Sequence, residues 1–308
     1  MPVSLVRDPR FARHQPGSRH AESAARLASI DVALAASRLR VVERPARAAD
    51  PEELLRVHTA AHVAAMAETA GRHVDIDPDT HASPDSYEAA LYAAGGTIDL
   101  ARDVMRGDTP PGMVMCRPPG HHATREHAMG FCLFNNVAAA AAALIDEGLA
   151  KKVAIYDFDF HHGNGTEAIF YSDPRVLYAS THQMPAYPGT GEADRTGMGL
   201  GKGANLNVPL EPGQGDIEIL RAIDQVIAPA IHRFSPDMIL LSAGFDALEG
   251  DPLGGLSVTI DGFHTIGARF WRIAEEVCEG RVAATLEGGY AIERLGTAVV
   301  AFLEAWDR

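Results

Sequence analysis

The sequence predicts an α/β fold, in which one open, mainly parallel sheet is flanked by helices on both faces. Short apolar segments bounded by Gly or Pro alternate along the chain with longer segments of helical character. Strands that are buried on both faces typically show such continuous apolar runs. No long linker, internal repeat or low-complexity tract interrupts this alternation, so we expect a single domain over residues 1–308.

Capping residues mark the expected helices. Asp50, followed by Pro and two Glu, is a strong helix start, and this helix is expected to run to about Ala70. Ser83 and Pro84 begin a second helix that ends near Gly107. Asn135 or Asn136 caps an alanine-rich helix that Gly148 ends. The remaining helices are expected over residues 22–37, 214–234, 261–279 and 292–306.

The expected strands lie between these helices. Each is short and largely apolar, as central strands of a parallel sheet are. They cover residues 113–116, 153–160, 176–180, 204–209, 238–243 and 282–286.

Composition and charge argue against nucleic-acid binding and membrane insertion. The chain has 27 basic and 41 acidic residues and a formal charge of −14, which disfavours direct nucleic-acid binding. Its three cysteines form no Cys-x-x-Cys pair and fit buried free thiols in a reducing compartment. The longest apolar run, residues 137–145, is too short to cross a membrane, and no signal peptide is recognisable. We therefore expect a cytoplasmic protein that does not bind a membrane; its oligomeric state stays open.

Two segments that follow predicted strands carry possible metal ligands. Asp157, Asp159 and His161 alternate along an extended segment and are expected to share one face, while Asp246 ends another strand. Carboxyl ends of parallel strands meet at one edge, where open α/β sheets bind ligands. Two carboxylates and an imidazole with an open fourth position indicate a catalytic zinc site, with Fe²⁺ or Co²⁺ as substitutes. A lone Asp would more often be a turn or cap residue. The hypothesis of a metal site therefore depends on the combination of these carboxylates with a histidine.

Two further strand ends carry polar side chains. His121 and His122 follow a Pro-Pro-Gly turn and suit acid–base chemistry near neutral pH, although such a pair can also be an exposed loop. Gly288 and Gly289 allow close backbone approach, and Tyr290 could then direct its hydroxyl at a reacting oxygen, unless it is a buried structural tyrosine. The chain contains neither a P-loop nor a Gly-x-Ser-x-Gly nucleophile motif.

Taken together, these segments resemble the histone deacetylase superfamily, which includes acetylpolyamine amidohydrolases and acetoin-utilisation proteins. The resemblance covers nearly the whole chain, and details such as Asn164 are similar to class II-like bacterial deacetylases. Its motifs, in the family's order, are His20-Ala-Glu-Ser-Ala-Ala-Arg-Leu27, Arg117-Pro-Pro-Gly-His-His122, Gly130-Phe-Cys132, Asp157-x-Asp-x-His-His-Gly-Asn-Gly-Thr166, Tyr187-Pro-Gly-Thr-Gly191, Gly244-Phe-Asp-Ala247 and Glu287-Gly-Gly-Tyr290.

The resemblance implies an arginase-like sheet and a role for each matching residue. Zinc would be bound by Asp159, His161 and Asp246. His121 and His122 would be the acid–base pair, with Asp157 orienting His121, Asn164 behind His122, and Tyr290 on the substrate carbonyl. The acyl-lysine channel would be formed by Gly130, Phe131, Tyr187, Gly288 and Gly289. A monovalent cation, K⁺, would lie near Asp157, Asp159, His161, Ser180 and Thr181. An aspartate that holds the substrate could be Asp77 or Asp79.

The function implied is a zinc-dependent amidohydrolase that removes acyl groups from lysine side chains by water attack. Acetylated polyamines or other small amides are alternative substrates, since an acidic surface suits either cation. The short segment between Ala70 and Ser83 favours acylated lysine, because acetylpolyamine amidohydrolases usually carry a longer insertion there. A catalytically silent protein that binds acylated ligands is a second reading. An arginase-like two-manganese hydrolase is a third, and would need more bridging carboxylates.

Overall fold

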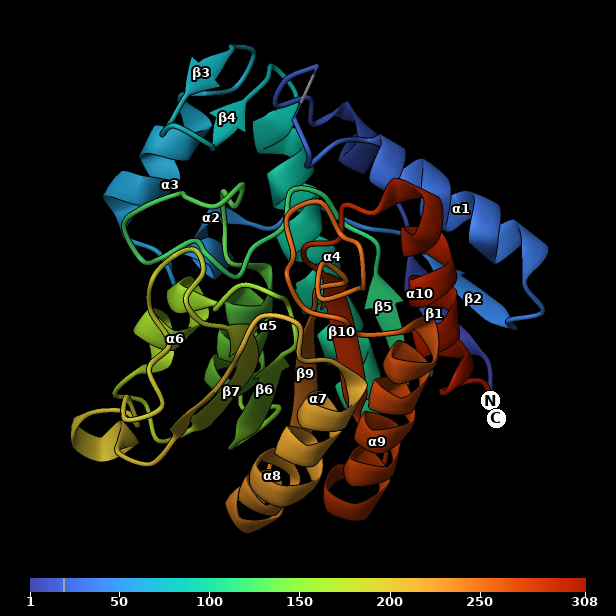
Figure 1. Cartoon of the computed structure of the whole chain (residues 1–308). Coiled ribbons are helices and arrows are strands. Elements are labelled where there is room, and N and C mark those ends of the chain that lie inside the picture. Colours follow the sequence, from blue (N-terminus) through green and yellow to red (C-terminus); the bar gives the residue numbers. More distant parts are fainter. Residues whose placement is uncertain (19) are drawn as a thin grey trace.

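Eight parallel strands form the central sheet of the computed structural model, which describes residues 1–18 and 20–308 (Figure 1). Their order across the sheet is β2-β1-β5-β10-β9-β6-β7-β8, and every neighbouring pair is parallel. The strands are β1 (Val3–Val6), β2 (Val41–Arg44), β5 (Gly112–Val114), β6 (Val153–Asp157), β7 (Val176–Gln183), β8 (Asn205–Leu210), β9 (Met238–Ala243) and β10 (Val282–Leu286). A separate antiparallel hairpin contains β3 (Val74–Asp75) and β4 (His81–Ala82).

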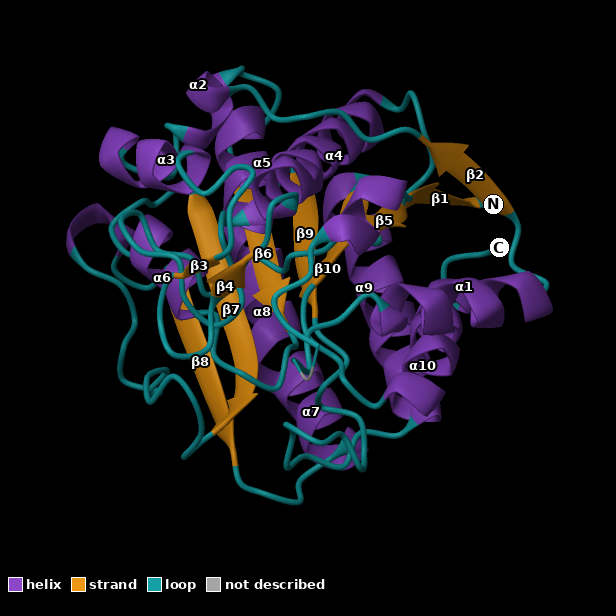
Figure 2. Ribbon diagram, turned by 90° about the horizontal axis from the view of Figure 1, so that it is seen from above, coloured by secondary structure: helices purple, strands orange, loops and turns teal. Residues whose placement is uncertain are grey.

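Helices cover both faces of this sheet (Figure 2). On one face, α4 (Ser86–Arg106) and α5 (Asn136–Asp146) pack against each other and against the central strands. On the other face lie α7 (Asp216–Ala222), α8 (Ala228–Phe234) and α9 (Ile260–Cys278), and α10 (Ile292–Glu304) packs between α9 and α1 (Ala25–Ala36). The short helices α2 (Pro51–Leu54), α3 (Ala60–Ala67) and α6 (Asn164–Phe170) lie among the connections. The expected α/β class and parallel sheet are confirmed.

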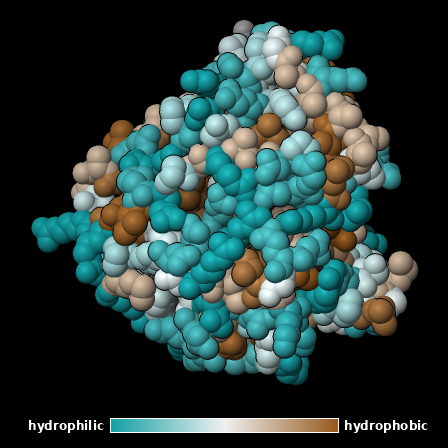
Figure 3. All heavy atoms as spheres, turned by 180° about the vertical axis from the view of Figure 1, so that it is seen from behind, coloured by the Kyte–Doolittle hydropathy of each residue, from teal (hydrophilic) through white to brown (hydrophobic). Residues whose placement is uncertain are grey.

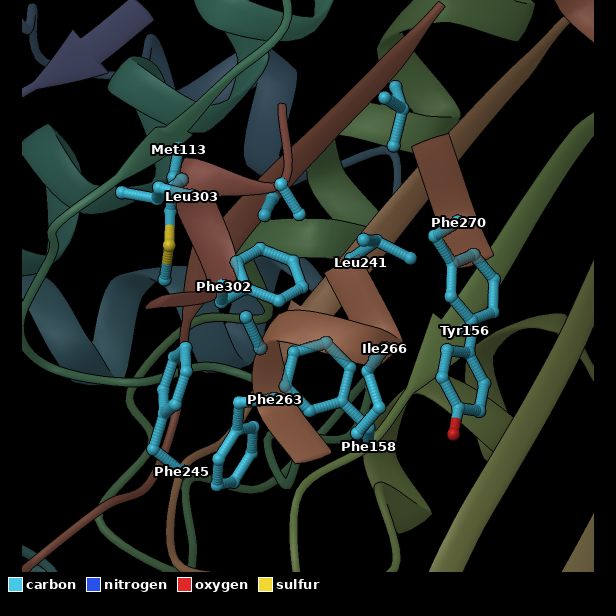
Figure 4. Close-up of a cluster of buried hydrophobic side chains, with 14 of the residues drawn as sticks. Met113, Tyr156, Phe158, Leu241, Phe245, Phe263, Ile266, Phe270, Phe302 and Leu303 are labelled. Atoms are coloured by element: carbon cyan, nitrogen blue, oxygen red, sulfur yellow. The ribbon is translucent and has the colours of Figure 1, made fainter. Parts of the chain in front are cut away.

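Alternation along each strand supplies a core on either face. In β6, Ala154 and Tyr156 pack into the cluster beneath α9 and α10, while Val153 and Ile155 pack into the cluster beneath α4 and α5. The first cluster is rich in aromatic rings, and Tyr156 stacks on Phe270 with ring centroids 4.4 Å apart (Figure 4). Burial on both faces explains why the strand sequences are continuously apolar.

The structure corrects three details of the expected elements. The helix expected to start at Asp50 is two helices, α2 and α3, because the Thr59 side chain caps α3 and its N–H bonds to the Arg125 carbonyl at 2.8 Å. The helix expected over residues 214–234 contains a π turn at Ile223–Ile227, next to Pro229, which has no N–H to donate. Strands β1, β2, β3 and β4 and helix α6 were not expected.

The surface is mainly polar. The face in Figure 3 is largely hydrophilic, with apolar side chains scattered over it. No helix in the described ranges is both long and apolar enough to cross a membrane.

Helix α9 offers a test of local stability. Thr259 caps the N-terminus of α9, as Thr59 caps that of α3. The Thr259 hydroxyl accepts the Gly262 N–H at 3.0 Å and donates to Asp216. Thr259→Ala is expected to lower the free energy of unfolding by about 1 kcal/mol, measured by urea unfolding, without changing the active site. Thr259→Ser keeps the hydroxyl and is the control. A serine variant as unstable as the alanine variant would show that the hydroxyl is not what stabilises this helix end.

Candidate active site

Four adjacent strands carry the polar residues identified in the sequence. In the sheet order β5-β10-β9-β6, the segment after β5 carries His121 and His122, and the segment after β10 carries Tyr290. Asp246 follows β9, and His161 follows β6. All of these segments leave the sheet at its carboxyl edge, which brings residues far apart in the sequence into one place.

Asp159, His161 and Asp246 form a compact group of possible metal ligands. One ligand atom from each lies within 4.8 Å of the others. Nδ1 of His161 is 3.1 Å from Oδ1 of Asp159 and 3.0 Å from Oδ2 of Asp246. The Phe160 N–H donates to Oδ1 of Asp246 at 2.8 Å and leaves Oδ2 facing the imidazole. The backbone therefore orients the carboxylates toward a common point.

The position of these ligands depends on a turn, which corrects one expectation. Strand β6 ends at Asp157, and residues 158–162 are not extended. The His161 N–H bends back to Oδ1 of Asp159 at 2.8 Å, and the Asp159 N–H donates to Oδ1 of Asp157 at 3.2 Å. Asp159 and His161 thus meet through a turn, whereas Asp157 is directed to another partner, described below.

The charges of this group fit a divalent cation. Asp159 and Asp246 are buried, and in the described chain their ion-pair partners are histidines rather than lysine or arginine. Burial and the neighbouring Asp159 carboxylate raise the pKa of Asp246 to about 7. Burial opposes charge on His161, but hydrogen bonds to both carboxylates raise its pKa to about 10. A proton thus supplies positive charge where a metal ion could replace it.

His121 and His122 lie beside this group with different partners. Their ring centroids are 4.0 Å apart. Nδ1 of His121 donates to Oδ2 of Asp157 at 3.0 Å, and Nδ1 of His122 donates to Oδ1 of Asn164 at 2.8 Å. Asn164 is the first residue of α6, so the start of this helix fixes its amide. Nε2 of His121 lies 3.8 Å from Oδ1 of Asp159, whereas Nε2 of His122 makes no hydrogen bond within the described residues.

Neighbouring groups shift the pKa values of His121 and His122 in opposite directions. Burial disfavours charge on His121, but Asp157, Asp159 and Glu287 outweigh it and raise its pKa well above the ordinary value. Burial and the charge of His121 lower the pKa of His122 well below the ordinary value. At neutral pH, His121 is therefore positively charged, and His122 is neutral with an unprotonated Nε2.

The segment that carries Tyr290 is held on several sides. The Gly288 N–H donates to Oδ2 of Asp159 at 2.8 Å, and a Cβ at Gly288 would lie 2.2 Å from Oδ2 of Asp246, so only glycine fits. Burial raises the pKa of Tyr290 well above its ordinary value. Its hydroxyl therefore stays protonated and can donate a hydrogen bond.

These groups surround a cavity of about 220 Å³. Asp79, rather than Asp77, lines it, because Asp77 turns back to accept the N–H groups of Asp79 and Thr80 at 2.9 and 2.6 Å. The other lining residues are Pro119, His121, His122, Gly130, Phe131, His161, Tyr187, Leu253, Gly288 and Tyr290. Pro119 and Leu253 were not expected from the sequence, since neither side chain is chemically distinctive.

Gly289 was expected in the channel but is not among the lining residues. Its φ is +126°, and a Cβ there would lie 2.8 Å from Leu295 and 3.0 Å from Phe245. Gly289 is thus required for the turn and for packing behind the cavity. Phe131 has a φ of +69°, which is costly for a bulky residue and marks the cavity wall as a strained site.

Of the residues expected to bind a monovalent cation, Asp157 and Ser180 lie side by side, whereas the side chain of Thr181 points elsewhere. Asp157 and Ser180 are register partners on β6 and β7. Thr181 points to the other face, where its hydroxyl bonds to that of Tyr156 at 2.8 Å. Only the backbone of Thr181 could therefore contribute to such a site.

Four buried charged residues support the site, and no role was expected for them from the sequence. Nε of Arg26 donates to the Gly289 carbonyl at 2.7 Å, and its guanidinium also contacts the Glu287 carbonyl. Glu22 lies between Arg26, at 3.1 Å, and Arg117, at 2.6 Å from Nη2. The Glu287 carboxylate accepts the N–H groups of Gly120 and His121 at 2.6 and 3.1 Å. This network fixes the segments before His121 and Tyr290.

Comparison with known proteins places the chain in a family. A family model described as the histone deacetylase domain matches residues 20–306. Similar proteins include Histone deacetylase 10, chloroplastic, of Oryza sativa subsp. japonica (47% identical, covering 71% of this chain and 51% of the relative). A Probable deacetylase of Archaeoglobus fulgidus is 38% identical over 95% of this chain and 82% of the relative.

Two further matches extend the comparison. Histone deacetylase 15 of Arabidopsis thaliana is 41% identical over 92% of this chain and 52% of the relative. The chain thus spans about half the length of both plant relatives. The crystal structure of the HDA15 HD domain superposes with a TM-score of 0.94 at 38% identity, covering 99% of this chain and 90% of that one.

Proposed function

The chain belongs to the histone deacetylase family, and on this premise we propose that it is a zinc-dependent deacetylase that removes acetyl or related acyl groups from lysine side chains. The observation that carries the proposal is one cavity lined by His121, His122, His161 and Tyr290, with two buried carboxylates beneath it. We assign the chain to the class II-like branch, because asparagine stands at position 164, beside His122.

The metal group and the histidines would divide the chemistry between them. Asp159, His161 and Asp246 would hold a divalent ion, which would supply the Lewis acidity that polarises an amide carbonyl and acidifies water. His122 accepts the proton of the attacking water at Nε2, since its Nδ1 is bonded to Asn164. The same nitrogen then gives a proton to the leaving amine. His121 stays positively charged and stabilises the negative charge that develops beside it.

The remaining residues hold the substrate. Tyr290 donates its hydroxyl to the carbonyl oxygen as negative charge develops there. Phe131 and Tyr187 lie on the cavity wall, where their rings can contact the methylene groups of a lysine side chain. Asp79 also lines the cavity and can accept a polar group of the substrate. The products are a carboxylate and a free amine.

The substrate class is tested by comparing acetyl-lysine peptides with acetylspermidine and acetylputrescine on the zinc-loaded protein. We expect the larger kcat/KM for the peptides, with about one zinc per chain. Faster turnover of the polyamines would favour the small-amide alternative. Two metal ions per chain would favour an arginase-like centre. Metal and ligand binding without any turnover would favour a silent acyl-binding protein.

Metal identity and K⁺ dependence are part of the same proposal. Zinc is the expected ion, with Fe²⁺ or Co²⁺ as substitutes, because the donor set is one imidazole and two carboxylates. Reconstitution of the metal-free protein with each ion, with and without K⁺, measures both preferences.

The position of Asn164 predicts a shift in the pH profile. His122 must be neutral to accept a proton, and its pKa is lowered, so activity is lost only as the pH falls well below neutrality. Asn164→Asp places a carboxylate on Nδ1 of His122 and raises that pKa, by about one unit or more. The acid limb of kcat/KM should therefore move to higher pH, at unchanged zinc content. An unmoved limb would mean that His122 is not the titrating base.

A further inference from the structure

Asp251 is a buried carboxylate that joins two parts of the cavity. It lies in the loop after β9, and its residue is 5% exposed. Oδ2 accepts the consecutive N–H groups of Tyr290 and Ala291 at 2.7 and 2.9 Å, and Oδ1 accepts the N–H of Leu253 at 2.9 Å. Tyr290 and Leu253 both line the cavity. One side chain therefore sets the backbone of both.

These bonds complete the support of the Tyr290 segment. Arg26 holds the carbonyl groups of Glu287 and Gly289, on the side from which the chain enters. Asp251 holds the N–H groups on the side from which the chain leaves. Loss of the carboxylate would leave the buried N–H of Tyr290 and the partly buried N–H of Ala291 without this acceptor, and the segment could then rotate. Rotation of the backbone at Tyr290 would carry its hydroxyl away from the substrate oxygen.

We propose that Asp251 is a positioning residue, which acts through Tyr290 by fixing the hydroxyl where the oxyanion forms. The proposal rests on the proposed deacetylase function. Because the hydroxyl interacts most strongly with charge that develops during reaction, Asp251 contributes to kcat more than to KM. A displacement of about 1 Å in a catalytic group can cost about 10²-fold in rate.

The test is a double-mutant cycle on the zinc-loaded protein. Asp251→Asn keeps the size of the side chain but replaces one acceptor oxygen with a donor. In the wild-type background it is expected to lower kcat by about 10- to 100-fold, with a small change in KM and full zinc content. In the Tyr290→Phe background the same substitution should lower kcat little further, because no hydroxyl remains to be misplaced. Equal losses in both backgrounds, or an unchanged kcat for Asp251→Asn, would overturn the proposal.

Asp237→Asn is a matched control. Oδ2 of Asp237 also accepts two consecutive N–H groups, those of Lys151 and Lys152 at 2.7 and 3.0 Å. These bonds lie at the opposite edge of the sheet, where β6 and β9 begin. The control should lose stability while retaining kcat. A loss of kcat as large as that of Asp251→Asn would show that any weakened loop impairs the enzyme.

Two further measurements are needed. The first tests whether the charge of Asp251 or the position of its oxygens matters, and the second separates failure of the positioning role from failure of the proposed deacetylase function. Asp251→Glu keeps the charge but displaces the oxygens, so its kcat should also fall; a wild-type rate would assign the effect to charge. If Asp251→Asn does not fold, Asp251→Glu replaces it in the double-mutant cycle. If no amide is hydrolysed, the proposed function fails, and hydroxamate affinity becomes the readout. Asp251→Asn should weaken it only where Tyr290 is present, and equal weakening in both backgrounds would overturn the positioning role.

Discussion

Replacing His161 with alanine is expected to abolish metal binding and amide hydrolysis together. His161 is one of three protein ligands, and its Nδ1 lies within 3.1 Å of a carboxylate oxygen of each of the other two. Without it, two buried carboxylates face each other with no imidazole between them, which leaves too few ligands for tight binding. Metal analysis should fall from about one ion per chain to nearly none, and Asp246→Ala should behave in the same way.

The neighbouring His162 provides the control for this variant. Its Nδ1 is 2.8 Å from the Thr190 hydroxyl, so it is directed away from the metal group. His162→Gln is expected to lose some stability because the residue is buried, but to keep its metal. Circular dichroism should show that both variants fold. Full occupancy in His161→Ala would exclude this residue as a ligand.

Replacing Tyr290 with phenylalanine is expected to lower kcat by about 10²–10³-fold, equivalent to about 3–4 kcal/mol. The substitution removes one preorganised donor to the developing oxyanion. The ring, its contact with Phe131 and the backbone bonds to Asp251 all remain, so packing should change little. Zinc content and melting temperature should stay close to those of the wild type. Residual activity is expected, since the metal group acts on the same charge.

Tyr156→Phe is the matched control, because it removes a buried hydroxyl that does not line the cavity. That hydroxyl bonds to Thr181 at 2.8 Å in the aromatic cluster. Its loss should lower stability by about 1 kcal/mol and leave kcat unchanged. The opposite pattern, with Tyr290→Phe melting early but turning over normally, would make Tyr290 a packing residue.

The sequence predicted the central sheet well because its strands are buried on both faces. Strands β9 and β10 match their expected bounds, since Gly244 and Glu287 end the two apolar runs. Edge strand β2 was missed because Glu43 and Arg44 give it no such run. The helix break before α3 depends on a bond from Thr59 to Arg125, which no local pattern reveals.

The site was predicted as a set of residue types rather than as a geometry. Asp159, His161 and Asp246 carry unusual polarity after apolar strands, and they could be recognised as a combination rather than individually. Asp251 could not, because an aspartate in a Gly- and Pro-containing loop ordinarily forms a turn, and its partners at Leu253 and Tyr290 depend on the folded sheet. Likewise, the choice between Asp77 and Asp79 depends on how the β3–β4 hairpin folds.

The attachment of the site to four neighbouring strands has a consequence for how the protein matures. Residues from His121 to Tyr290 meet only when β5, β6, β9 and β10 are paired, and these pairings join segments distant in the chain. Such non-local topology folds slowly, and the three proposed metal ligands meet only when β6 pairs with β9. An ion held by these ligands would therefore favour the chain in which the two strands are paired. At 100 times its dissociation constant such an ion would add about 2.7 kcal/mol to the free energy of unfolding, so metal supply during synthesis would also raise the yield of folded chain.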